Sequence, residues 1–110
     1  MIPAPFPNHQ KTKAMKHKIH IPEHVQKKWA EMTERNDHTG VLWEIACFFS
    51  YAEFKYEEFE KIADKLAWVI KERDRIGYLS GDILRERDGA FDSLKALIIE
   101  GYGMEVWKQL

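Results

Sequence analysis

The segment from Val41 to Phe49 is almost entirely apolar, and it constrains the fold more than any other part of the chain. Glu44 is its only charged residue. The segment is far shorter than the roughly 20 residues that a membrane-spanning helix needs. A helix that is apolar on every side has to be buried on every side, inside the fold or against another subunit. We therefore expect a central helix over 40–50, and because few other elements are left to enclose it, we also expect a homo-oligomer.

Before this segment, apolar side chains recur at the spacing of an amphipathic helix. Val25, Trp29 and Met32 fall at i, i+4 and i+7. Pro22 precedes them and suits a helix start, where its missing N–H costs nothing. The polar cluster over 36–40 predicts a turn that ends this helix.

After the apolar segment, the pattern predicts a long third helix. Ser50 and Glu53 have the spacing of a capping box, which predicts a helix start near Tyr51. Apolar residues then repeat every three or four positions over 59–70. Gly77 follows as a natural stop, because glycine accepts the left-handed conformation that often ends a helix.

A fourth helix is expected from Ser80, whose side chain suits an N-cap. Its apolar positions run over 83–98, and Gly101 and Gly103 are expected to end it. One further helical turn is expected over 104–110. The sequence therefore predicts an all-α protein, a compact bundle of four to five helices.

The N-terminal part differs from the rest of the chain. Residues 1–16 contain alternating prolines and three lysines but little apolar material, which predicts a flexible Pro/Lys-rich arm. Ile19 and Ile21 alternate in the following segment, which favours a short edge strand over 17–21. We expect residues 17–110 to form a single helical domain.

Charge is unevenly distributed along the chain, although its net charge is only -1. Residues 1–30 hold six lysines and one glutamate, whereas residues 31–110 hold 11 basic and 17 acidic side chains. An acidic body repels phosphate, so we expect no nucleic-acid binding except through the basic arm. The single cysteine excludes an intramolecular disulfide framework. We expect no membrane association and a cytoplasmic location.

Metal-dependent chemistry has one candidate set of carboxylates. Glu57, Glu60 and Asp64 share one helix face, and the first two resemble the leading E-x-x-E pair of helical nucleotide pyrophosphatases. The second acidic pair of that family is missing, and so few carboxylates hold Mg²⁺ weakly. A carboxylate-based hydrolase is therefore our third hypothesis.

Histidine and cysteine side chains do not have the spacing of a metal site. His17, His20, His24 and His38 precede Cys47 without a Cys-x-x-Cys or a His-x-x-x-His pair on one helix, because His20 and His24 lie on either side of Pro22. Cys47 lies in the most apolar stretch, where a buried structural thiol is expected rather than a nucleophile. We expect no metal, no cofactor and no catalytic residue.

Arginine side chains flank the expected turn between the third and fourth helices. Together with an aromatic residue they form a candidate ligand-binding rim, which consists of Arg73, Arg75, Tyr78, Arg85 and Arg87. Such a rim suits a nucleotide at a subunit interface, which is our second hypothesis. Acidic residues interleave with these arginines, so ordinary salt bridges are the favoured explanation of this cluster.

Aromatic side chains are frequent for so short a chain, at 13% of residues. Aromatic residues are favoured as anchors of protein interfaces. The candidate anchors are Tyr51, Phe54, Tyr56 and Trp107. Our first hypothesis is therefore a non-enzymatic protein-interaction module, a regulator or inhibitor of the type found among small phage and mobile-element proteins.

Overall fold

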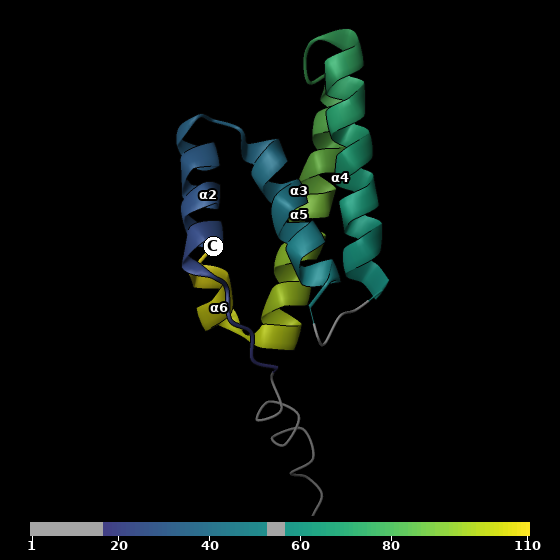
Figure 1. Ribbon diagram of the computed structural model, residues 1–110. Coiled ribbons are helices and arrows are strands. Elements are labelled where there is room, and N and C mark those ends of the chain that lie inside the picture. The colour runs from purple at the N-terminus through teal and green to yellow at the C-terminus, as the bar shows by residue number, and fades with distance from the viewer. Residues whose placement is uncertain (1–16, 53–56) are drawn as a thin grey trace, which may run out of the picture.

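The computed structural model describes residues 17–52 and 57–110, which form five helices and no strand. The helices are α2 (Glu23–Glu34), α3 (His38–Ser50), α4 (Glu57–Ile76), α5 (Gly81–Tyr102) and α6 (Met104–Lys108). Figure 1 shows α3 in the middle, with α2 on one side and the pair α4 and α5 on the other. The predicted all-α bundle is confirmed. None of the described helices is long and apolar enough to span a membrane.

Helix α3 is the central element that its apolar sequence predicts. Over residues 39–50 every side chain is buried or half-buried. Phe49 is fully buried, and its ring stacks on Phe59 of α4 at 5.4 Å and meets Tyr102 of α5 edge-on at 5.1 Å. One chain thus covers most of this helix, while Val41, Trp43, Cys47 and Phe48 stay half-buried. Self-association stays a prediction.

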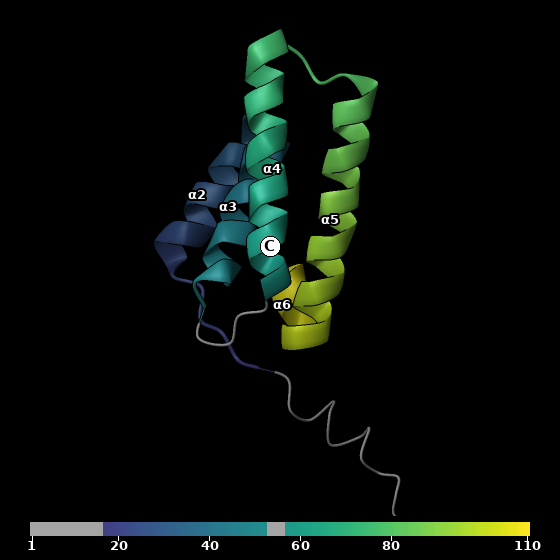
Figure 2. The same cartoon turned by 90° about the vertical axis from the view of Figure 1, so that its right-hand side faces the viewer.

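Helices α4 and α5 form an antiparallel pair, which Figure 2 shows side by side. Leu66 and Val69 of α4 and Leu94 and Ile98 of α5 are fully buried between the helices. As predicted, Gly77 ends α4 with φ 87°, and the Ser80 hydroxyl accepts a hydrogen bond from the Ile83 N–H. Helix α3 packs against this pair.

The start of α3 lies earlier than predicted, because Asp37 is the N-cap. Its carboxylate accepts a hydrogen bond from the Gly40 N–H at 3.1 Å and lies 3.8 Å from the Arg73 guanidinium of α4. A Cβ atom at position 40 would approach this carboxylate to 2.5 Å. Gly40 therefore belongs to the first turn of α3 rather than to the preceding turn.

The helix start predicted near Tyr51 is wrong, because Tyr51 and Ala52 form a turn after α3, and Glu53 of the predicted capping box lies outside the described residues. Ser50 is the last residue of α3, and its hydroxyl donates to the Cys47 carbonyl at 2.7 Å, a bond within its own helix. Helix α4 is described from Glu57. Of the two glycines that were expected to end the fourth helix, only Gly103 does so, with φ 105°. Gly101 is instead buried within α5.

The edge strand predicted over 17–21 is not formed, because no other strand exists among the described residues to pair with it. The segment instead runs along the helices as irregular backbone. The His17 N–H donates to the Gly101 carbonyl at 2.8 Å, and Ile21 is buried in the core. The alternation of Ile19 and Ile21 thus reflects packing against helices. The arm predicted over 1–16 lies outside the described residues.

Candidate functional site

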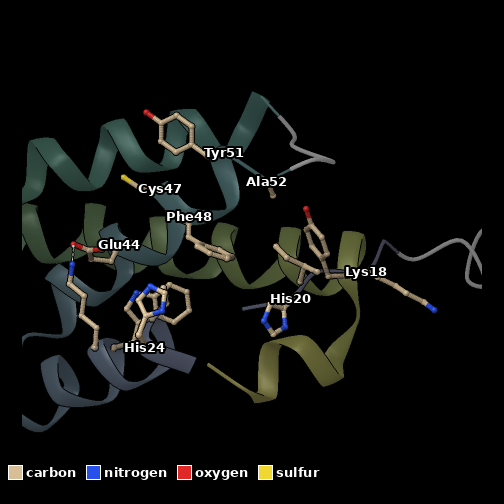
Figure 3. Close-up of a pocket in the computed structure, with 13 residues that line it drawn as sticks. Lys18, His20, His24, Glu44, Cys47, Phe48, Tyr51 and Ala52 are labelled. Atoms are coloured by element: carbon tan, nitrogen blue, oxygen red, sulfur yellow. Dashed lines mark hydrogen bonds and ion pairs between the residues drawn. The ribbon is translucent and has the colours of Figure 1, made fainter. Parts of the chain in front are cut away.

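A concave feature beside the central helix lies between α2, α3 and the segment over 17–22. This cavity of about 630 Å³, which we call the α2–α3 groove, is open to solvent. It is lined by Lys18, Ile19, His20, His24, Val25, Lys28, Trp29, Glu44, Cys47, Phe48, Tyr51, Ala52 and Tyr102. Figure 3 shows the Phe48 ring projecting from α3 toward the side of α2 where His24 lies. A volume of this order suits a small molecule or a segment of a partner protein.

Helical spacing explains why these side chains gather in one place. On α2, His24 and Lys28 are four residues apart and share a face beside the buried Trp29. On α3, Glu44, Cys47, Phe48 and Tyr51 follow the i, i+3, i+4, i+7 pattern of one helix face. The two faces meet because α2 packs on α3.

Aromatic rings form the walls of the groove. Phe48 meets Trp29 edge-on at 5.5 Å, so these two rings fix α2 against α3. Tyr102 is buried by its contact with Phe49. Tyr51 differs from them, since it is 87% exposed at the edge of the groove. A large aromatic side chain held in solvent beside a cavity is a typical interface anchor.

The charged groups of the groove are mainly basic. Lys18, Lys28 and two imidazoles line it against one carboxylate, that of Glu44. Lys28 Nζ lies 3.2 Å from Glu44 Oε2, and this ion pair links α2 to α3 (dashed in Figure 3). Both side chains are partly exposed, so the pair contributes little to stability.

The indole N–H of Trp29 is buried at this site. Among the described residues, its Nε1 is the buried side-chain nitrogen without a hydrogen-bond partner. A buried N–H without an acceptor costs about 1–3 kcal/mol relative to a paired one.

The Cys47 thiol lines the groove but is not activated. Burial raises the pKa of Cys47, and the negative charges of Glu44 and Asp64 raise it further. A raised pKa leaves less of the reactive thiolate at neutral pH. The predicted burial of this thiol is corrected, because Cys47 is half-buried at the wall of the groove, whereas its raised pKa agrees with the predicted lack of nucleophilic character.

We expect Cys47 to react slowly with Ellman's reagent at pH 7.5, at least about tenfold slower in the folded protein than in urea. The raised pKa and the partial burial both act in this direction. Glu44→Gln removes one of the negative charges and is expected to speed the reaction of the folded protein. Equal rates in the folded and unfolded protein would show that the fold neither shields the thiol nor raises its pKa.

The predicted interface anchors fall in different places. Tyr51 lines the α2–α3 groove, whereas Trp107 of α6 lies in a second cavity of about 370 Å³, with Val41 and Phe91 among its lining residues. Trp107 is half-buried, since its ring packs edge-on against Phe91 at 5.7 Å. Phe54 and Tyr56 lie outside the described residues.

The arginines of the predicted rim all lie close to carboxylates. The pairs are Arg73 with Asp37 and Asp74, Arg75 with Glu72, Arg85 with Asp82, and Arg87 with Asp88. The hydrogen bond from Arg75 lowers the pKa of Glu72 and raises that of Arg75. These contacts are the salt bridges that the interleaved charges favour.

The structure does not bring the whole rim to one cavity. Arg85 lines a groove between α4 and α5 together with Trp68, whereas Arg87 lines the cavity that holds Trp107. Tyr78 is 63% exposed in the turn before α5. Ligand binding by this rim stays a prediction.

The candidate carboxylates of a metal site, Glu57, Glu60 and Asp64, are all exposed along α4. Glu57 Oε1 lies 3.8 Å from Lys61 Nζ. In the part of the chain that the structure describes, no group of three or more His, Cys, Asp or Glu side chains is placed to hold a metal ion. Metal-dependent hydrolysis stays a prediction that these residues do not support.

Sequence reasoning missed most of the groove. His24, Lys28, Glu44 and Phe48 were not candidate site residues, although the i, i+4 spacing of each pair was visible in the sequence. Comparison of the chain with models of known protein families, with curated proteins and with solved structures finds no match.

Proposed function

We propose that this protein is a non-enzymatic interaction module, a small regulator or inhibitor that binds a segment of a partner protein in the α2–α3 groove. The observation that carries the proposal is Tyr51, which is 87% exposed at the edge of a cavity with aromatic walls. Exposed tyrosines of this kind commonly contribute much of the binding energy of an interface.

The surroundings of Tyr51 support binding rather than covalent chemistry. The Cys47 thiol has a raised pKa, and the Glu44 carboxylate is engaged by Lys28. A nucleophile needs a lowered pKa or an adjacent free base. The proposal includes a cytoplasmic location, which suits the unpaired thiol of Cys47.

The proposal is tested by selecting peptides from a random displayed library on the full chain and measuring their affinity for variants. We expect Tyr51→Ala to weaken the selected peptides by about tenfold or more, the usual effect of removing an interface anchor. Tyr78→Ala is the matched control, because Tyr78 is also exposed but does not line the groove.

Two results would contradict the proposal. Selected peptides that bind Tyr51→Ala as tightly as the unmodified chain would show that the groove edge is not the binding surface. Selection that yields no peptide above background would contradict the proposal that this protein is an interaction module. A circular dichroism melt of each variant separates lost binding from lost folding.

A further inference from the structure

The α2–α3 groove is basic, whereas the part of the chain over 31–110 is acidic. Residues 17–30 contain Lys18, Lys27 and Lys28 against the single acid Glu23, whereas residues 31–110 hold 17 acidic and 11 basic side chains. Two of these lysines and two histidines line the groove. A negatively charged segment is attracted to this groove and repelled by the acidic surface that residues 31–110 provide.

Glu44 has a special position in this arrangement. It is the one carboxylate among the residues that line the groove, and it lies against Lys28 at 3.2 Å. The pair connects two different helices, and the Lys28 side chain is 57% exposed, so a carboxylate from solvent has access to the same ammonium group. Glu44 therefore occupies the position that an acidic ligand would take.

We propose that the groove binds an acidic segment of a partner protein, and that one of its carboxylates displaces Glu44 from Lys28. An apolar side chain of the same segment packs against Phe48, and Tyr51 covers it from the edge of the groove. Glu44 then selects against neutral segments, because only a negatively charged group replaces the ion pair that is lost. This inference rests on the proposed function and names the chemistry of its partner.

The described groove favours a peptide over a nucleic acid. Single-stranded nucleic acids need aromatic faces on which successive bases stack. Phe48 and Trp29 use their rings to pack against each other, and Tyr102 packs against Phe49, which leaves Tyr51 and the imidazoles of His20 and His24 as the exposed rings of the groove. No arginine lines the groove, although arginine is the usual partner of phosphate.

The test uses two short synthetic peptides that carry a fluorescent label, one with Glu and Ser around a central Leu and one with Gln in place of Glu. Fluorescence anisotropy gives the Kd of each peptide for the full chain. We expect the Glu peptide to bind at least about tenfold more tightly than the Gln peptide. Glu44→Gln is expected to lower the Kd of the Glu peptide about threefold, and Lys28→Gln to raise it about tenfold.

Glu86→Gln is the matched control, because Glu86 also forms an ion pair between two helices, with Lys65, but does not line the groove. It is expected to leave the Kd unchanged. An unchanged or higher Kd in Glu44→Gln would overturn the displacement of Glu44, and equal binding of the two peptides would overturn the acidic partner. Tighter binding of a short oligo-dT that competes with the Glu peptide would assign the groove to nucleic acid. The Tyr51→Ala measurement with library peptides tests the proposed function independently of all three results.

Discussion

Phe49→Ala is expected to lower the free energy of unfolding by about 3–5 kcal/mol, the usual effect of removing a fully buried phenylalanine. Phe49 has no exposed surface, and its ring contacts Phe59 of α4 and Tyr102 of α5. The substitution therefore leaves a cavity where three helices meet. A small domain has about 5–15 kcal/mol of stability in total, so much of it would be lost.

Urea denaturation followed by circular dichroism measures this effect. Phe91→Ala serves as the control, because Phe91 is 36% exposed on α5 and its ring packs mainly on Trp107. We expect Phe91→Ala to lower the free energy of unfolding clearly less than Phe49→Ala does. A loss below about 1 kcal/mol for Phe49→Ala would contradict the central position of α3 in the core.

Lys28→Glu is expected to raise the Kd of the Glu peptide by about 100-fold at low salt. No other single substitution in the groove is expected to have so large an effect. The change removes the ammonium group that the acidic segment is proposed to engage. It also places a second carboxylate beside Glu44, which lies 3.2 Å from the lysine in the unmodified protein. The Kd of both proteins, measured by anisotropy, checks the expectation.

Lys27→Glu is the matched control for this substitution. Lys27 precedes Lys28 on the same helix and is also exposed, but it does not line the groove. We expect an effect of only a few-fold, which salt near 0.5 M removes by screening. An equal loss for both variants would mean that general charge, rather than the position of Lys28, controls binding.

The helices were predictable because their signals are local. The apolar run over 41–49 predicted the buried α3, and Gly77 and Ser80 marked the turn between α4 and α5 correctly. The errors also have local causes. The Ser50 hydroxyl donates within its own helix instead of capping the next one, and Ile19 and Ile21 alternate without a neighbouring strand.

The site was harder to predict because it depends on which helix faces meet. The His24 and Lys28 pair and the Glu44 and Phe48 pair are separated along the chain, and no pattern within α2 or α3 indicates that they line one groove. Tyr51 is predictable as an anchor from its aromatic ring and its place at the junction of the second and third expected helices. Its neighbours became candidates only after the packing of α2 on α3 was known.

Mapping of the binding surface by NMR tests the central claim most directly. A ¹⁵N-labelled sample of the full chain is titrated with the tightest peptide from the library, and the amide shifts are followed. We expect the largest changes over residues 18–29 and 44–52, which contain nearly all of the residues that line the α2–α3 groove. Changes concentrated around Phe91 and Trp107, or along the outer faces of α4 and α5, would contradict the assignment of this groove as the partner-binding site.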